Sequence, residues 1–533
     1  MSLLDRIERA GNALPDPATL FLVGALVVMG LSHVAVMADW EVTKTVMRDG
    51  AEVAEIVRAR SLLTSDGAYW AVDSLVDNFK NFPPLAIVLV GMLGIGLADR
   101  SGLISAALKA LLVALPDALV RALLRLMPHS QGISGTIKAL PRYSLTPIVF
   151  FVGVLSSLAL DAGYVVLPPI AASLYASMGR SPLAGLAAVF AGVSAGFSAN
   201  LMPTGLDVVL AGFSTAGANI IDAGYAVAPT ANLGFMIAST FLLTAVGWAV
   251  TALWVEPRLA SKPAEDGGPV PATPADEQTL SAEEKRGLLA GGTAGAVILG
   301  IYLAATWVPG APLHGMDGNF PRWVAAMIPL IFIGFFIPGI AYGFATGKLR
   351  NDRDVAAMLG ETMSGMGGYI VLAFFAAQFV AYFSYSGLGQ MLAISGGEVL
   401  ASAALPAPVL MLAFIGVVMA GNLFIGSMSA KYAFFAPVFV PMFMAVGISP
   451  ELTQAAYRVG DSITNVVTPL NPYVVIVLVF VKQWVPKAGI GTLMALMVPY
   501  AIAFAVAWSL LLVGWMWAGI PLGPEGPLHY VAP

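Results

Sequence analysis

The segment 455–480 contains residue types that can bind ions or break helices, although the chain as a whole is very apolar. Arg458 and Asp461 stand three positions apart, so a helix would carry them on one face. Charged residues at membrane depth are costly and usually functional. The two could form a structural ion pair. We favour Asp461 as a cation ligand, with Arg458 facing a substrate or pairing with another acid.

A second polar group lies in the segment AGNLFIGSMSAKYA, which begins at residue 420. Asn422, Gly426 and Ser429 offer amide, backbone and hydroxyl oxygens that suit a small cation or a polar substrate. The competing interpretations are a hydrogen bond from Asn422 to a neighbouring helix and close packing of small residues. Lys431 either snorkels or pairs with an acid, and we assign it no role. Tyr432 is the aromatic residue that we expect to face a substrate.

The first half of the chain has its own acids and breaks. Asp161 and Asp207 are each candidates for a proton carrier, because burial in a low dielectric favours the protonated carboxyl. Each could equally be an interfacial acid or a hairpin cap. Proline ends or kinks a helix, and we expect the asparagine of each break to be a structural partner of a hairpin tip. The residues expected to break helices are Asn200, Pro203, Asn465 and Pro469.

Composition restricts the class of protein. The chain has 533 residues, of which 58% are hydrophobic and 11% charged, and its mean hydropathy is +0.84. Soluble domains average about 25% charged residues, so this is a polytopic membrane protein. A net charge of −5 indicates no nucleic-acid partner, and the absence of cysteine excludes disulfides and thiolate metal sites. No glycine-rich loop ends in Lys-Ser/Thr, which disfavours ATP as the direct energy source and leaves no cofactor beyond a bound cation.

The apolar runs predict an all-α fold with about nine transmembrane helices, since about 20 apolar residues span a bilayer. Two shorter runs, 145–176 and 407–442, are interrupted by small and polar residues and are interpreted as re-entrant hairpins. A Pro- and acid-rich cytoplasmic linker over 256–286 separates a first half, 1–255, from a second, 287–533. With the N-terminus inside, Lys and Arg concentrate on the inner segments. The spans are predicted to begin near Pro17, Pro83, Pro182, Pro229, Gly287, Trp323, Ala356, Leu452 and Gly491.

The two halves are weakly similar in sequence. DAGYVVLPP (161–169) resembles SAKYAFFAP (429–437), GRSPL (179–183) resembles GISPE (447–451), and SGL at 101–103 recurs at 386–388. The topology makes this an inverted repeat, in which each half has a hairpin followed by a broken helix, at about 182–213 and 452–480. Inverted repeats with discontinuous helices are typical of secondary transporters, which bind substrate and ion near the midplane. Broken backbone at that depth must line a cavity or be buried in protein.

With these motifs the chain resembles the p-aminobenzoyl-glutamate transporter family, most clearly at 421–442, 456–473 and 198–207. The resemblance implies a homodimer of subunits with nine membrane helices and two hairpins in a bacterial inner membrane. Matching by motif assigns a sodium site to Asn422, Gly426 and Asp461. It assigns transport-critical positions to Asp207, Tyr432, Pro450 and Arg458. The family commonly has Trp at the position of Tyr432, which affects the expected substrate preference.

We therefore expect a cation-coupled secondary transporter of small aromatic amines or acids, driven by sodium or protons. The resemblance slightly favours export of sulfonamide-type antimetabolites over movement of p-aminobenzoyl-glutamate. The residues themselves do not determine the direction of transport. One alternative is a sodium–dicarboxylate symporter, although the twin hydroxyl–amide motifs at the hairpin tips are absent. Another is an intramembrane hydrolase that uses Asp161 and Asp207. A passive channel is the third.

Overall fold

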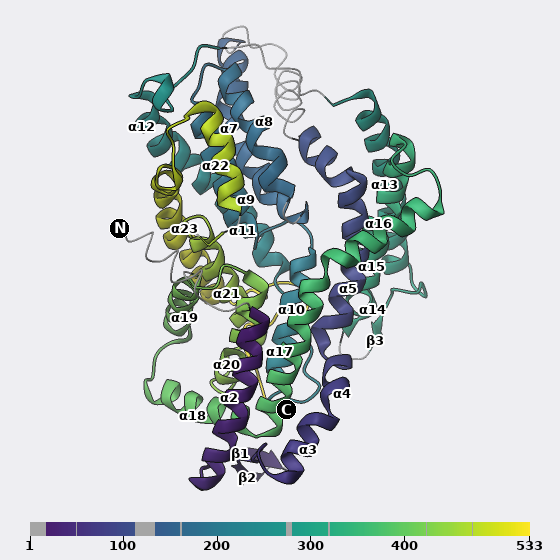
Figure 1. Ribbon diagram of the computed structural model, residues 1–533, viewed down its shortest axis with the longest axis vertical. Coiled ribbons are helices and arrows are strands. Elements are labelled where there is room, and N and C mark those ends of the chain that lie inside the picture. Colours follow the sequence, from purple (N-terminus) through teal and green to yellow (C-terminus); the bar gives the residue numbers. More distant parts are fainter. Residues whose placement is uncertain are drawn as a thin grey trace.

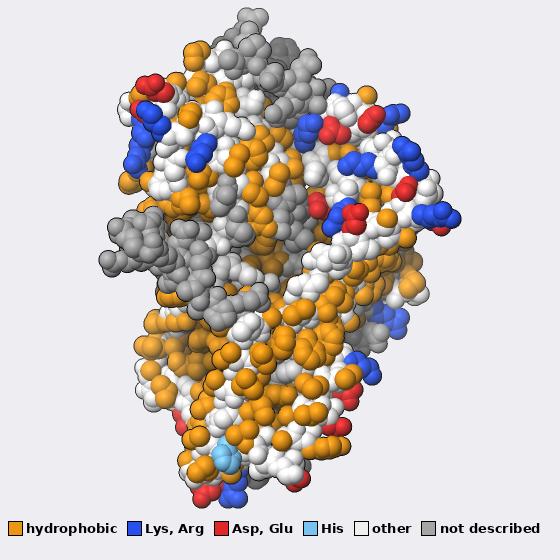
Figure 2. All heavy atoms as spheres, viewed as in Figure 1, with side chains coloured by type: hydrophobic (Ala, Val, Ile, Leu, Met, Phe, Trp, Pro, Cys, Tyr) orange, Lys and Arg blue, Asp and Glu red, His pale blue; other side chains and the backbone are white. Residues whose placement is uncertain are grey.

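The structure is a computed structural model that describes residues 17–48, 51–111, 134–159, 162–272, 280–317, 320–422, 424–468, 470–471 and 473–532. Helices make up almost all of its regular structure (Figure 1). Apolar side chains cover most of the face in Figure 2, and the Lys and Arg side chains gather mainly toward its upper end. The all-α polytopic fold is therefore confirmed.

The first half contains these elements in order: α2 (Pro17–Met37), β1 (Glu41–Arg48), β2 (Ala51–Arg58), α3 (Ser65–Asp73), α4 (Leu75–Lys80), α5 (Pro83–Ser101), α7 (Ser134–Leu155), η1 (Ser156–Ala159), α8 (Ala162–Ser177), α9 (Pro182–Gly196), α10 (Gly205–Ala218) and α11 (Leu233–Val250). The strands β1 and β2 form an antiparallel pair within this otherwise helical half. Their alternating Val, Thr and Ile residues favour strands.

The second half follows a π-helical turn (Thr251–Val255), α12 (Glu256–Ala260) and η3 (Ala264–Asp266). Its elements are α13 (Ala282–Trp307), β3 (Met316–Asp317), β4 (Phe320–Pro321), α14 (Arg322–Ala325), α15 (Met327–Thr346), α16 (Asp352–Gly365), α17 (Gly367–Tyr385), α18 (Leu388–Ser402), α19 (Ala407–Gly421), α20 (Met428–Met444), α21 (Pro450–Asn465), α22 (Tyr473–Trp484) and α23 (Ile490–Ala518).

Seven helices of the described chain are long and apolar enough to cross a bilayer: α2, α5, α11 with its continuation to Ala260, α13, α15, α17 and α23. The spans predicted near Pro182 and Leu452 are each two shorter helices, α9–α10 and α21–α22. The span expected near Ala356 begins later, at α17, because α16 carries four charged residues and is amphipathic. The total of nine crossings stays a prediction.

The linker is ordered at its start. Arg180 at the end of the turn before α9 donates from Nε to Glu256 of α12 at 2.7 Å, and the two side chains are largely buried. Ser181 Oγ donates to the carbonyl of Gly267 at 2.6 Å. Residues 256–272 thus pack on the first half.

The turns that precede α9 and α21 have the same structure. Gly179 and Gly447 both adopt the left-handed conformation, with φ of 69° and 79°. A serine then caps each helix through its hydroxyl, and a proline occupies the first helical position. Pro450 is this first residue of α21. The short similarity between GRSPL and GISPE therefore corresponds to one helix-start motif used in both halves.

The repeated SGL tripeptide also forms one motif. Gly102 and Gly387 end α5 and α17 in the left-handed conformation, with φ of 91° and 74°. In both copies the serine hydroxyl donates to the carbonyl three residues before it, at 3.0 and 3.2 Å. The two SGL segments upstream of the hairpins are therefore similar in structure as well as in sequence.

The halves are interlocked at their breaks. The helix after the first break, α10, packs on the second hairpin helix α20, and the helix after the second break, α22, packs on the first hairpin helix α8. In the same way in both halves, the helix before each break packs on a hairpin helix of its own half: α9 on α7 and α21 on α19. Gly192 and Gly460 allow these close approaches, because an added Cβ would lie 3.0 Å from the Phe150 carbonyl oxygen and 2.8 Å from that of Ile415. Each break is therefore enclosed by elements of both halves.

Candidate functional site

The first break, between α9 and α10, is fixed by a buried amide. Asn200 Nδ2 donates to Ser157 Oγ at 2.7 Å, at the turn of the first hairpin, and its Oδ1 accepts from the Leu201 amide at 2.8 Å. Pro203 is half-buried in the same break. The predicted break residues of the first half thus lie beside the hairpin tip, as expected. Asp161, which we placed at that tip, lies outside the described residues.

The second break, between α21 and α22, is tied to both halves. Asn465 Nδ2 donates to the Ser194 carbonyl of α9 at 3.1 Å, and Asn471 Nδ2 donates to the Asn465 carbonyl at 3.2 Å. Thr468 Oγ1 donates to the Asn422 carbonyl at the second hairpin at 3.1 Å. These bonds satisfy backbone groups that the interrupted helices leave free. Pro469 lies outside the described residues.

A buried ion pair joins the two broken helices. Arg458 Nη2 of α21 lies 2.5 Å from Asp207 Oδ1 at the start of α10, and the two side chains are 1% and 0% exposed. The other Asp207 oxygen accepts from the amide and hydroxyl of Thr204 at 2.6 and 2.8 Å. Arg458 thus pairs with an acid, as favoured, but the acid is Asp207 of the other half. The interpretation of Arg458 and Asp461 as partners is wrong.

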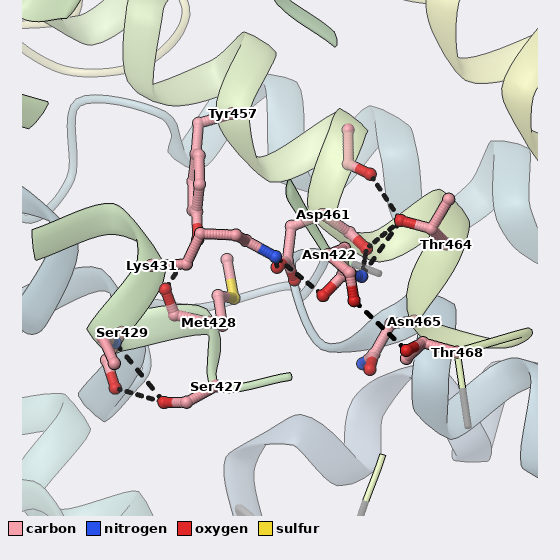
Figure 3. A network of polar contacts seen from close by, with 12 residues as sticks. Asn422, Ser427, Met428, Ser429, Lys431, Tyr457, Asp461, Thr464, Asn465 and Thr468 are labelled. Atoms are coloured by element: carbon pink, nitrogen blue, oxygen red, sulfur yellow. Dashed lines mark hydrogen bonds and ion pairs between the residues drawn. The ribbon is translucent and has the colours of Figure 1, made fainter. Parts of the chain in front are cut away.

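The predicted sodium ligands Asn422 and Asp461 are close together, with a lysine between them (Figure 3). Lys431 Nζ lies 2.5 Å from Asp461 Oδ1 and 2.7 Å from Asn422 Oδ1. Asn422 Nδ2 donates to the Asp461 carbonyl at 2.9 Å and to Thr464 Oγ1 at 3.0 Å. The oxygens suit a hard cation, but in this arrangement the lysine ammonium already neutralises the carboxylate. Sequence reasoning left Lys431 unassigned and so missed this contact.

Gly426 brings the second hairpin tip against the second break. A Cβ added there would lie 2.7 Å from the Leu470 carbonyl oxygen, closer than packing allows. Ser429 is half-buried nearby, and its hydroxyl lies 3.5 Å from that of Ser427. Glycine at position 426 is therefore explained by this close approach.

Tyr432 is fully buried between α10 and α21. Its hydroxyl lies 2.6 Å from Ser214 Oγ, which in turn donates to Gln454 Oε1 at 2.7 Å. Its ring lies 4.3 Å from that of Tyr457, measured between centroids. The side chain thus faces protein in this conformation. Ser214 and Gln454 were missed, although a polar residue within each of two helices was a usable signal.

No group of three or more His, Asp or Glu side chains that could hold a metal occurs in the described part of the chain. The polar centre is instead built from two separate cation–carboxylate pairs, Arg458–Asp207 and Lys431–Asp461. All four side chains are at most 2% exposed.

A family model described as the AbgT putative transporter family matches residues 2–130 and 128–530. The chain belongs to this family. Membership in AbgT places it among transporters and not among enzymes, so the intramembrane hydrolase alternative is wrong. It is accordingly a multi-pass membrane protein.

Individual AbgT proteins match over nearly the whole chain. The p-aminobenzoyl-glutamate transport protein of Escherichia coli (strain K12) is 33% identical over 528 residues, which are 97% of this chain and 95% of that protein. The Alcanivorax borkumensis YdaH transporter is 41% identical, with a TM-score of 0.83, over 96% of this chain and all of that one. Neisseria gonorrhoeae MtrF, from a class of antimetabolite efflux pumps, is 36% identical with a TM-score of 0.85, over 99% of this chain and all of that one.

Proposed function

We propose that this AbgT protein is a cation-coupled secondary transporter of small aromatic amines or acids. It exports sulfonamide-type antimetabolites, moves p-aminobenzoyl-glutamate, or does both. One observation carries the proposal: the Nε of Arg458 is buried and has no hydrogen-bond partner among the described residues. A buried donor without an acceptor is costly. A carboxylate or sulfonyl oxygen of a bound substrate would satisfy it.

The relatives and the neighbouring aromatic residues support this substrate class. The Escherichia coli relative is named for p-aminobenzoyl-glutamate, and MtrF for antimetabolite efflux. p-Aminobenzoyl-glutamate and the sulfonamide-type antimetabolites both join an aminobenzene ring to an acidic or strongly polar group. Tyr432 of α20 and Tyr457 of α21, the helix that also carries Arg458, form an aromatic pair. A rearrangement that separates these rings would let a substrate ring pack between them.

Coupling to sodium is part of the proposal. Asn422 and Asp461 present an amide oxygen and a carboxylate oxygen to one point in the protein interior. Two such oxygens, completed by the backbone of the hairpin tip near Gly426, fit the oxygen ligands that a hard cation prefers. Protons are the alternative coupling ion, and Asp207 is then the candidate carrier within the ion pair.

Transport would proceed by alternating access. The hairpins and broken helices of the two halves are interlocked, so they would move together as one unit around the substrate. The remaining long helices, among them α13 and α15, would form the scaffold. We further propose that the scaffold makes a homodimer in a bacterial inner membrane, which the mass of the detergent-solubilised protein would test.

The decisive experiment follows radiolabelled sulfonamide and p-aminobenzoyl-glutamate in liposomes under imposed sodium and proton gradients. Arg458→Lys keeps a positive charge opposite Asp207 but removes the Nε donor. We expect at least a roughly tenfold rise in KM for substrate with sodium binding retained. Asp461→Asn should abolish the response to the sodium gradient. Flux that ignores both gradients would identify a passive channel and overturn the proposal.

A further inference from the structure

The ammonium of Lys431 occupies the point between two oxygens that the sequence assigns to sodium. It contacts Asp461 Oδ1 at 2.5 Å and Asn422 Oδ1 at 2.7 Å, and its side chain is 0% exposed. The two bonds that Asn422 Nδ2 donates leave the amide oxygen directed at the ammonium (Figure 3). The lysine therefore has the coordination that a small monovalent cation would have there.

The inverted repeat shows that the lysine and its acid belong together. At the equivalent positions of the first half stand Gly163 instead of Lys431 and Val193 instead of Asp461. Both charges are absent there. A Cβ at Gly163 would lie 2.2 Å from Ser156 Oγ, so that half has no room for a longer side chain. The second half thus carries a cation and an anion that have no counterpart in the first half.

The ring of Tyr457 offers the ammonium a second position close to the first. Lys431 Nζ lies 5.8 Å from the centroid of the Tyr457 ring, inside the distance at which an aromatic face attracts a cation. The Tyr457 hydroxyl donates to the Met428 carbonyl at 2.6 Å, which holds the ring in place. Rotation of the four-carbon stem can carry the charge toward that ring while the lysine stays protonated.

We propose that Lys431 is a tethered cation, which competes with the coupling sodium ion for Asn422 and Asp461. This inference rests on the sodium coupling proposed above. In the sodium-free carrier the ammonium neutralises the buried carboxylate, which would otherwise be strongly destabilising. When sodium binds, it displaces the ammonium toward the Tyr457 ring. The affinity for sodium is therefore set by how much more favourably the two oxygens bind sodium than they bind the ammonium.

Equilibrium binding of radioactive sodium to the purified full-length protein tests this competition. In Lys431→Gln the competitor is gone and Asp461 lacks a counter-charge, so the Kd for sodium should fall at least about tenfold. In Lys431→Arg the Kd should rise, because a guanidinium binds a carboxylate through two parallel hydrogen bonds and is harder to displace. Sodium affinity that is unchanged or weaker in folded Lys431→Gln would overturn the inference.

Thermal unfolding covers the case in which Lys431→Gln is too unstable to purify in choline chloride. The same protein in sodium chloride of equal ionic strength should then be rescued, with a larger rise in Tm than wild type shows. Absence of rescue contradicts the competition. The underlying sodium proposal fails separately, if wild type and Lys431→Gln both bind no sodium. If wild type binds sodium and Asp461→Asn does not, while Lys431→Gln equals wild type, only the tethered-cation inference fails.

Discussion

Asp207 and Arg458 stand 251 positions apart in the sequence and form a buried ion pair with a nitrogen–oxygen distance of 2.5 Å. Asp207 belongs to the first turn of α10 and Arg458 to the middle of α21, so the pair links the helix after the first break to the helix before the second. Asp207 also accepts two bonds from Thr204 at the break itself. The pair therefore couples the geometry of one break to the position of the other half.

Asp207→Asn should lower stability by about 3 kcal/mol, because it leaves the Arg458 guanidinium buried without its counter-charge. Thermal unfolding in detergent measures this loss. Thr204→Val removes only the hydroxyl that donates to Asp207 and should cost about 1 kcal/mol. Equal effects of the two substitutions would mean that the Arg458–Asp207 ion pair adds no stability beyond that of the Thr204–Asp207 cap at the start of α10.

Gly426→Ala should displace the second hairpin tip, since its Cβ would lie 2.7 Å from the Leu470 carbonyl oxygen. We expect a loss of about 1–3 kcal/mol in stability and a clear loss of transport in the liposome assay. Gly416→Ala, in the same hairpin, is the matched control, because nothing lies within 4 Å of its added Cβ. If both alanine variants transport like wild type, the close approach at the tip has no functional role.

The sequence predicted local structure well where the signal was local. The motifs visible in the sequence were the serine and proline that begin α9 and α21, the repeated SGL at the ends of α5 and α17, and the asparagines and prolines of the two breaks. Each of these depends on the backbone preferences of a few adjacent residues. The repeat then predicted that the two halves share an architecture.

Contacts between residues far apart in the sequence could not be predicted in the same way. Arg458 was expected to face a substrate or to pair with an acid, but the sequence did not show that the acid is Asp207 in the other half of the chain. Lys431 was left without a role, because a sequence does not show whether a lysine stem points to lipid or inward to Asp461. Tyr432 was expected to face a substrate, and its burial against Ser214 depends on how α10 crosses α20.

Tyr432→Phe and Ser214→Ala should destabilise the protein to different degrees. Loss of the Tyr432 hydroxyl leaves Ser214 still bonded to Gln454 at 2.7 Å, so we expect a cost of about 1 kcal/mol. Loss of the Ser214 hydroxyl removes a partner from both Tyr432 and Gln454, and should cost more. Unfolding of both single variants and the double variant gives the coupling energy. Strict additivity would contradict a shared network.

Stability should also fall at alkaline pH through Tyr225, in the loop between α10 and α11. Its hydroxyl donates to both oxygens of Glu451 at 3.1 Å. Burial and then the Glu451 carboxylate raise the pKa of Tyr225 above its ordinary value. The folded protein therefore keeps this proton while the unfolded chain releases it near pH 10, so the free energy of unfolding decreases as the pH rises above about 10.

Thermal unfolding between about pH 8 and pH 11 measures this loss of stability, because the range brackets the ordinary tyrosine pKa of about 10. Tyr225→Phe removes the titrating group and should make the alkaline decline shallower. Tyr69→Phe is the matched control, because the Tyr69 side chain is 70% exposed and its removal should leave the decline as it is. Identical declines in wild type and Tyr225→Phe would show that the Tyr225–Glu451 contact does not hold the proton.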